Sequence, residues 1–381
     1  TGARVQAMIV VLTQCFPPAV GGIENLMGNA SRQLAERGIE VVVLADGRPP
    51  AVPDPVLAGV DVRYFSGWRP LRRLAKMLAL RRLLKGRRAE ALFADSWKSL
   101  ETLRRSGCAG ACDRIVAYAH GNEYPASPKW RKRRRIEAVL AVATLVLANS
   151  RFTQGRAAAF TGDPDKIRLR PPPIDPPAPV STDDAAWAAS VWEGQGPRLL
   201  TLCRLEPLKG IDNTLQALPA LLKDHPGLRY VVAGSGDDRP RLEALASATG
   251  VSAAVRFVGT VAGGRKSALY ASADLFVMPT RREGTREEGF GMVFAEAAAH
   301  GLPVVAGRSG GATDAVVDGE TAVIVDGADV AAIAAAVGDL LAAPERRAAM
   351  GQAAERFGRA LTWPERIAGL EVDLLGPARR G

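Results

Sequence analysis

Residues 8–45 read MIVVLTQCFPPAVGGIENLMGNASRQLAERGIEVVVLA and contain two short apolar runs on either side of an amphipathic stretch. The runs MIVVL (8–12) and EVVVLA (40–45) are rich in β-branched residues and almost free of polar ones, which is typical of strands covered on both faces. Between them, apolar residues recur with helical spacing up to Gly38. The stretch therefore predicts a strand, a helix and a second strand, the repeating unit of a parallel α/β sheet.

The same alternation continues along the rest of the chain. Further apolar runs of strand length are separated by helical stretches: RIVAYAH (114–120), ATLVLANS (143–150), RLLTLC (198–203), RYVVAGSG (229–236), VRFVGT (255–260), DLFVMPT (274–280), PVVAG (303–307) and TAVIVD (321–326). Six prolines in RPPPIDPPAPVS (170–181) exclude a central strand or a continuous helix there, so this segment is a stiff linker. We therefore expect an α/β fold of two doubly wound, Rossmann-like domains, residues 1–175 and 182–362, facing a cleft where ligands collect beyond the strand ends.

Composition and charge narrow the functional classes. A chain of 381 residues with 47% hydrophobic residues is typical of a globular protein of two domains, and it contains no apolar run of about 18 residues that would span a membrane. The net charge of +10 is concentrated in two basic clusters, Arg63–Arg88 and Arg131–Arg135. These clusters predict either a solvated face or attraction to an anionic membrane surface. We expect no nucleic-acid partner, because no nucleic-acid-binding motif surrounds the clusters.

The first basic cluster has a helical pattern. The bases at 69, 72, 73 and 76 share one predicted face, and Leu71, Leu74 and Leu78 share the opposite one, available to dip into a membrane interface. The phase slips beyond this stretch, so we expect either a break near Leu80 or two short helices.

Cysteine usage favours a reduced, cytoplasmic setting. The four cysteines, at 15, 108, 112 and 203, have no spacing that indicates a disulfide framework. Cys108, Cys112 and His120 lack a fourth ligand and the usual zinc spacing, so we interpret the cysteines as core residues and expect no metal site.

Two stretches near strand ends carry groups suited to a diphosphate. Gly21 and Gly22 lie at the junction between the first strand and its helix, where backbone amides approach an anion closely; a plain turn is the alternative. Arg204 and Lys209 follow the strand at 198–203, and two cations there suit a diphosphate whose charge grows as a bond breaks. By contrast, YVVAGSGDD has Arg239 where a dinucleotide fingerprint needs its third glycine, so a dehydrogenase is disfavoured.

Glu288 and Glu296 lie eight residues apart around a Gly-Phe-Gly turn in REEGFGMVFAE (286–296), and RREGTRE (281–287) adds charge beside Glu288. We expect the turn to open a helix whose free amides bind phosphate or sugar oxygens. At 1.5 Å per residue the two acids would be separated by about 12 Å, enough to reach both ends of a nucleotide sugar. A helix cap with an exposed acid is the alternative. The amides concerned are those of Gly289, Phe290, Gly291, Met292 and Val293.

In this order, the motifs resemble the family 4 glycosyltransferases of the GT-B fold over nearly the whole chain, and the pattern is most similar to the phosphatidylinositol mannosyltransferase branch. The segments that carry the resemblance are GGIE (21–24), HGNE (120–123), ANSRFT (148–153), CRLEPLKG (203–210), VAGSGDD (232–238), FVGTV (257–261) and EEGFGMVFAEAAAHGLPVVAGRSGGATDAVVDG (287–319). The resemblance also implies that a last helix, within 363–381, packs back on the first domain.

The resemblance implies a role for each matched residue. Arg204 and Lys209 would bind the donor diphosphate, with Gly21 and Gly22 closing over it from the other domain. Base recognition would use the backbone around Val258 and Gly259. The remaining implied roles are Glu296 on the ribose, Glu288 and the amides of Gly289 to Val293 on the transferred sugar and phosphate, and His120 beside the reacting sugar.

The function implied is retaining transfer of a hexose from GDP-mannose or a UDP-sugar to a lipid or lipid-linked acceptor in cell-envelope glycan synthesis. No cofactor or metal is expected, and the enzyme would be peripheral on the inner face of the plasma membrane. The sequence offers no convincing carboxylate nucleophile for double displacement. We therefore expect transfer on one face of the sugar. Two alternatives stay open: a nucleotide-sugar epimerase or hydrolase on the same scaffold, and a basic membrane-binding protein.

Overall fold

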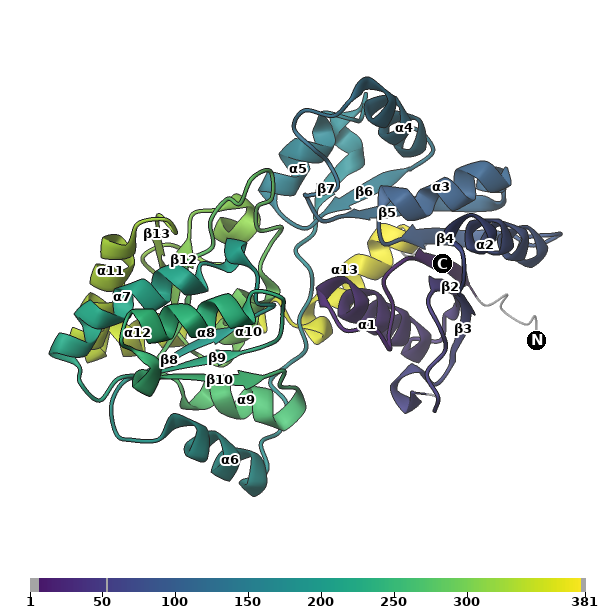
Figure 1. The fold of residues 1–381 in the computed structure, drawn as a ribbon. Helices are drawn as coiled ribbons and strands as arrows, with labels where there is room; N and C mark the ends of the chain where they lie inside the picture. Colours follow the sequence, from purple (N-terminus) through teal and green to yellow (C-terminus); the bar gives the residue numbers. More distant parts are fainter. Residues whose placement is uncertain (1–6, 53, 378–381) are drawn as a thin grey trace. The chain divides into compact units, whose positions relative to one another are not determined.

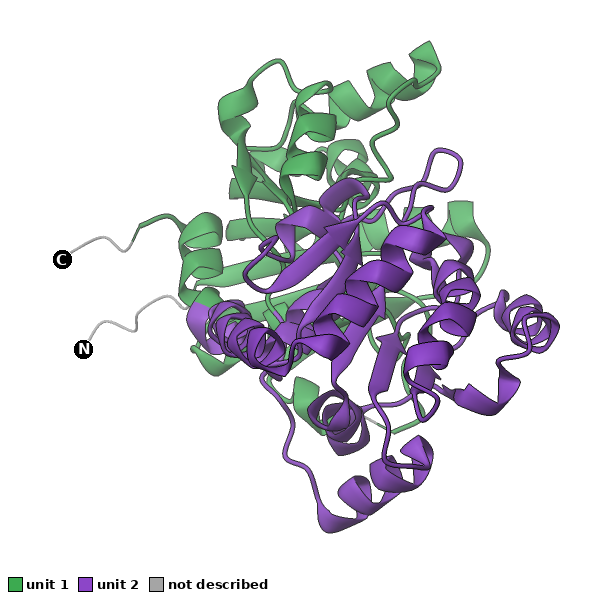
Figure 2. Ribbon diagram, turned by 90° about the vertical axis from the view of Figure 1, so that its left-hand side faces the viewer, with its two compact units in different colours: residues 1–173, 366–381 green, residues 174–365 purple. Residues whose placement is uncertain are grey.

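The computed structural model describes residues 7–52 and 54–377. Contacts within the chain divide it into two compact units (Figures 1 and 2). Unit 1 comprises Thr1–Pro173 and Arg366–Gly381, and unit 2 comprises Ile174–Glu365.

Unit 1 is built on a parallel sheet of seven strands in the order β3-β2-β1-β4-β5-β6-β7. Its strands are β1 (Met8–Thr13), β2 (Glu40–Asp46), β3 (Val60–Phe65), β4 (Ala89–Ala94), β5 (Cys112–Ala119), β6 (Leu145–Ala148) and β7 (Ile167–Leu169). Every residue of β1 is buried, because helices cover both faces of the sheet. The sheet order places the carboxyl ends of β1, β4 and β5 side by side.

The helices of unit 1 follow its strands. They are α1 (Gly22–Glu36), α2 (Arg69–Leu83), α3 (Trp97–Ser106), α4 (Trp130–Leu140) and α5 (Arg151–Ala158), with short 3₁₀ turns at Pro55–Leu57, Ala109–Ala111 and Pro164–Lys166. Helix α3 packs between α2 and α4.

Helix α2 corrects two expectations about the first basic cluster. Arg69–Leu83 is one helix, with neither a break near Leu80 nor a division into two. Its predicted basic face is turned partly inward, because Lys76 is 4% exposed and forms an ion pair with Asp46. The apolar stripe on the opposite face is exposed, with Leu71 61% exposed and Leu74 47% exposed. The ion pair between Lys76 and Asp46 on β2 therefore turns part of this basic face toward the sheet.

Helix α13 (Trp363–Leu375) is the last helix of the described chain, and its residues from Arg366 on belong to unit 1. Asp373 is fully buried and forms ion pairs with Arg168 and Arg170. Glu371 pairs with Arg37 at 2.7 Å, just beyond the end of α1.

Unit 2 has a parallel sheet of six strands in the order β10-β9-β8-β11-β12-β13. The strands are β8 (Arg198–Leu202), β9 (Arg229–Ala233), β10 (Val255–Gly259), β11 (Leu275–Met278), β12 (Val304–Gly307) and β13 (Ala322–Val325). The helices are α6 (Thr182–Trp192), α7 (Ile211–Asp224), α8 (Arg239–Ala248), α9 (Gly263–Ser272), α10 (Met292–Ala299), α11 (Val330–Ala342) and α12 (Pro344–Arg359), with 3₁₀ turns at Pro207–Lys209, Ser252–Ala254 and Gly310–Asp314. Neighbouring β8 and β11 bring the loops that follow them to the same place.

The expected α/β class with two parallel sheets is confirmed, and each apolar run predicted to be a strand contains one. The prediction missed β3, β4 and β7. Strand β4 reads AEALFA, whose alanines favour a helix, yet five of its six residues are buried in the sheet. In the described part of the chain, no helix has both the length and the hydropathy needed to cross a bilayer.

Candidate active site

The carboxyl edge of the unit 2 sheet is formed by loops packed backbone against backbone. A Cβ added at Gly234 would lie 1.8 Å from the carbonyl oxygen of Cys203, and one at Gly236 would lie 2.2 Å from that of Leu205. The loops after β8 and β9 are joined here, since the amide of Leu205 donates to Ser235 O. These glycines are therefore required by loop packing, which explains a glycine pattern without a dinucleotide fingerprint.

Lys209 and Glu288 form the central contact of this edge. Lys209 Nζ lies 2.5 Å from Glu288 Oε2, and the two side chains are only 15% and 12% exposed. Burial lowers the pKa of the ammonium, but the charge and hydrogen bond of Glu288, together with the nearby Cys203 and Glu206, outweigh this effect, so the pKa of Lys209 is raised. Glu288 is held by the backbone as well, because Gly311 N donates to its carbonyl at 2.7 Å. The result is a fixed, charged pair at the ends of two adjacent strands.

Arg204 does not join that pair. Its guanidinium contacts Glu206 at 3.0 Å, and its side chain is 63% exposed. Arg286 contacts the other oxygen of Glu206 at 2.6 Å. Burial acts to raise the pKa of Glu206, but the two arginines, Arg286 foremost, outweigh it and lower that pKa. Glu206 and Arg286 were missed by the sequence analysis, although RREGTRE had indicated extra charge near Glu288.

The Gly-Phe-Gly turn opens α10. Gly291 is the N-cap residue with φ 83°, in the left-handed region that favours glycine, and the helix begins at Met292. Gly289 therefore lies in the loop, and its amide donates to Glu288 Oε1 at 3.2 Å. Phe290 is buried at 2% exposure and anchors the turn. Helix geometry leaves the first-turn amides, including that of Val293, without intrahelical acceptors.

Glu296 has its own set of partners on α10. Lys266 Nζ lies 3.0 Å from Glu296 Oε1, and the hydroxyl of Tyr270 donates to Oε2 at 3.1 Å. His300 bonds the Glu296 carbonyl at 2.8 Å and stacks on Tyr270. Burial raises the pKa of Tyr270 well above 10.0, so its phenol is a donor at neutral pH. Sequence reasoning found no sign of these roles for Lys266 and Tyr270, because both lie on α9, a helix that matches no motif.

Val258 and Gly259 lie at the end of β10. Gly259 has φ 73°, and its carbonyl accepts from Gly234 N at 2.7 Å. The backbone of this strand end is therefore bonded to the loop after β9.

The predicted residues of unit 1 lie at the carboxyl ends of β1 and β5. Gly21 is the N-cap of α1 in extended conformation, and a Cβ on it would lie 2.2 Å from Glu24 Oε2; Gly22 begins the helix. His120 follows β5, its backbone amide donates to Glu123 Oε1 at 2.7 Å, and Asp95 O lies 2.8 Å from its Nε2.

Metal-ligating groups do not cluster in the described residues. No set of three or more His, Cys, Asp or Glu side chains with metal-binding geometry occurs there. Cys108 and Cys112 are free thiols. Cys112 and Cys203 are buried, as expected of core residues, whereas Cys15 and Cys108 are only half-buried.

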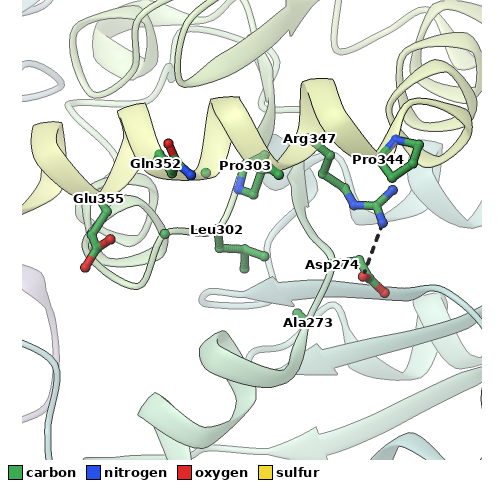
Figure 3. Close-up of a pocket in the computed structure, with 11 residues that line it drawn as sticks. Ala273, Asp274, Leu302, Pro303, Pro344, Arg347, Gln352 and Glu355 are labelled. Atoms are coloured by element: carbon green, nitrogen blue, oxygen red, sulfur yellow. Dashed lines mark ion pairs between the residues drawn. The ribbon is translucent and has the colours of Figure 1, made fainter.

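A pocket of about 360 Å³ lies at the opposite end of the unit 2 strands. It is formed by the loops before β11 and β12 and by α12, and Figure 3 shows Arg347 directed toward Asp274 across it, at 3.8 Å. None of the predicted site residues is among those described as lining it.

Both halves of the chain are similar to known glycosyltransferases. The family model described as "Glycosyltransferase Family 4" matches residues 20–177, and "Glycosyl transferases group 1" matches 185–357. A GDP-mannose-dependent alpha-(1-6)-phosphatidylinositol monomannoside mannosyltransferase of Mycolicibacterium smegmatis is 33% identical over 98% of this chain and 99% of its own length. A GDP-mannose-dependent monoacylated alpha-(1-6)-phosphatidylinositol monomannoside mannosyltransferase of Corynebacterium glutamicum is 28% identical over 90% of this chain and 91% of its own length.

Solved structures share the fold. Anabaena HepE in complex with UDP and glucose superposes with a TM-score of 0.79 at 19% identity, covering 97% of this chain and 99% of HepE. Sucrose-phosphate synthase of Thermosynechococcus elongatus gives 0.77 at 20% identity, covering 96% and 97%. These likenesses confirm the expected GT-B fold. With relatives matched over almost their full length and charged pairs fixed at the strand ends, the chain belongs to the family 4 glycosyltransferases.

Proposed function

We propose that this enzyme is a retaining, metal-independent mannosyltransferase that transfers mannose from GDP-mannose to a phosphatidylinositol-mannoside lipid. The observation that carries the proposal is the Lys209–Glu288 pair, fixed at 2.5 Å beside the start of α10. It offers a cation for a diphosphate and a carboxylate for sugar hydroxyls within one site. The donor and the acceptor class are those in the names of the mycobacterial and corynebacterial relatives.

On the donor side, each group has a chemical task. Lys209 and Arg204 neutralise the diphosphate, and a lysine has three donors, so Lys209 can bind a phosphate oxygen while it keeps Glu288. The first-turn amides of α10 bind anionic or hydroxyl oxygens. Glu296 accepts from the ribose hydroxyls, held by Lys266 and Tyr270. Val258 and Gly259 contact the base through the backbone.

The transfer step occurs on one face of the sugar. The bond from the anomeric carbon to the leaving phosphate oxygen breaks, and the bond to the acceptor oxygen forms on the same side, so configuration is retained. The proton of the acceptor hydroxyl passes to the leaving phosphate oxygen. Lys209 and Arg204 stabilise the charge that develops on the diphosphate, which is the task a metal ion performs in other transferases.

For unit 1, we assign Gly21 and Gly22 to the diphosphate and His120 to the reacting sugar, the roles that the family resemblance implies. The lipid is presented at an anionic inner leaflet, to which unit 1 binds through α2 and α4. Four large apolar side chains support this, each between 38% and 71% exposed: Trp68, the N-cap residue of α2, and Leu71, Leu74 and Leu78 of the helix itself. Arginines flank the stripe, and Trp130 is 64% exposed at the start of α4, whose basic segment is Arg131–Arg135. Such a surface gains energy from both interfacial burial and charge.

The test combines donor binding with product analysis. GDP-mannose at about 100 times its dissociation constant should add about 2.7 kcal/mol to stability, and UDP- and ADP-sugars should add much less. Labelled mannose should then appear in the lipid fraction only when phosphatidylinositol monomannoside is present, and NMR should show an α-linkage. Turnover should survive EDTA. Release of free mannose without acceptor would indicate a hydrolase, and absence of stabilisation by every donor would refute the proposal.

A further inference from the structure

Asp95, directly after β4, uses every one of its polar groups. Its amide donates to Leu12 O at 3.1 Å, and its carboxylate oxygen Oδ2 accepts from Gln14 N at 2.7 Å. The same oxygen accepts from Thr13 Oγ1 at 2.9 Å and from Cys15 N at 3.3 Å. The side chain is only 2% exposed. A buried carboxylate with this many donors is fixed in position, and its hydrogen bonds hold in place the start of the segment that leads from β1 toward Gly21.

The carbonyl group of Asp95 faces the other side, toward β5. Asp95 O lies 2.8 Å from His120 Nε2. A carbonyl oxygen only accepts hydrogen bonds, so Nε2 must carry the proton. In the neutral imidazole, Nδ1 is then left with a lone pair. Tyr118 stacks on the ring with centroids 5.2 Å apart, which fixes the plane of the imidazole.

The sheet order explains why one residue reaches both partners. Strand β4 lies between β1 and β5, so Asp95 follows the middle strand of three whose carboxyl ends are adjacent. The β1 end is also held by Lys76, whose buried ammonium donates to Thr13 O at 2.9 Å. Movement of the Asp95 carboxylate would therefore shift both the Gln14–Cys15 turn and the carbonyl that bonds His120.

We propose that Asp95 is a positioning residue for the transfer reaction: it locks His120 in the tautomer protonated at Nε2 and holds the Gln14–Cys15 turn in place. The inference rests on the proposed function, because His120 is there assigned to the reacting sugar. In the part of the chain that the structure describes, His120 Nδ1 has no hydrogen-bond partner. In this tautomer Nδ1 accepts a hydrogen bond from a hydroxyl group of the substrate. The site therefore selects a sugar with a donating hydroxyl at that position.

The test reads the tautomer directly. The chain has three histidines, so ¹⁵N-histidine labelling gives a spectrum that His120→Gln and His225→Gln variants assign. Wild-type His120 should show the Nε2-protonated tautomer without any substrate. Asp95→Ala should give a mixture of tautomers and lower kcat about 10²-fold, the scale expected for a misplaced reactive group. Asp95→Asn should restore both, because its amide oxygen can accept the bonds that Oδ2 accepts.

Ser96→Ala is the matched control. Ser96 Oγ donates to the other carboxylate oxygen, Oδ1, at 3.0 Å, so its loss should leave the tautomer and kcat unchanged. A wild-type His120 protonated at Nδ1 would overturn the proposal even if Asp95→Ala does not fold. So would a folded Asp95→Ala variant with the wild-type tautomer and kcat. An inactive wild type with the expected tautomer would instead count against the proposed function alone.

Discussion

The Lys209–Glu288 pair gives the sharpest test of the donor site, because stability and turnover should respond differently to its removal. Lys209→Met deletes the ammonium and keeps most of the stem, and leaves a carboxylate that is 12% exposed without its partner. Breaking a buried ion pair costs about 3–5 kcal/mol, and the residual exposure of this pair lowers our expectation to about 2–3 kcal/mol. In a unit of this size, that loss should lower the midpoint of thermal unfolding by about 5–10 °C.

The double variant Lys209→Met/Glu288→Gln separates the two roles. Removing both charges leaves no uncompensated carboxylate, so its stability should return to within about 1 kcal/mol of the wild type. Turnover should not return, because the diphosphate still lacks its cation. We expect kcat to stay about 10²–10³-fold below wild type, the cost of losing one group that stabilises developing charge.

Scanning fluorimetry and mannose transfer to lipid measure the two quantities on the same preparations. The pKa of Lys209 is raised above 10.5, so the contribution of the pair should be constant from pH 7 to 9 and should fall only as the pH rises through the raised pKa. The reasoning fails if Lys209→Met keeps near-normal turnover, or if the double variant recovers turnover together with stability.

Three further predictions follow from contacts in unit 1. Burial, with the nearby charges of Asp95 and Glu24, raises the pKa of Cys15 from 9.0 to about 12. Iodoacetamide at pH 8 should therefore alkylate Cys15 about 10³-fold more slowly in the folded protein than in the urea-unfolded chain, and equal rates by peptide mass spectrometry would contradict this. Asp373→Ala leaves Arg168 and Arg170 without their buried partner and should lower the free energy of unfolding by about 3 kcal/mol, seen as a lower midpoint of thermal unfolding. A change below about 0.5 kcal/mol would show that α13 does not depend on these ion pairs. The double variant Leu71→Glu/Leu74→Glu should bind vesicles containing anionic phospholipid at least about tenfold more weakly, without loss of stability, because both side chains are exposed. The control Val372→Glu, on α13 at 44% exposure, should bind as wild type, and unchanged binding of the double variant would exclude α2 as the membrane surface.

The sequence was most informative where local pattern decides structure. The runs RLLTLC and DLFVMPT are apolar and rich in leucine, valine and phenylalanine, and both contain strands. The turn at Gly291 was equally legible, because only glycine adopts its left-handed conformation without strain. Strand β4 could not be predicted from the sequence, since its alanines have low β propensity and its burial comes from neighbouring strands.

The candidate site was predicted residue by residue, but its partnerships were not. Arg204 and Lys209 were expected to act together, whereas one is exposed with Glu206 and the other is buried with Glu288. Lys266, on a helix with no motif, has become the partner of Glu296. Contacts of this kind depend on which helix covers which strand, and residue spacing alone does not carry that information.

By itself the sequence determined the α/β class and the family, because apolar periodicity and motif order are local properties of the chain. The stiff linker at 170–181 stays a prediction. Only the tertiary structure decided that Lys209 and Glu288 meet, since β8 and β11 become neighbours through a crossover that local patterns do not encode. It also decided that Lys76, on the predicted basic face, is buried. Strand order sets these contacts, because parallel strands adjacent in a sheet bring their carboxyl ends together however far apart they lie in the chain.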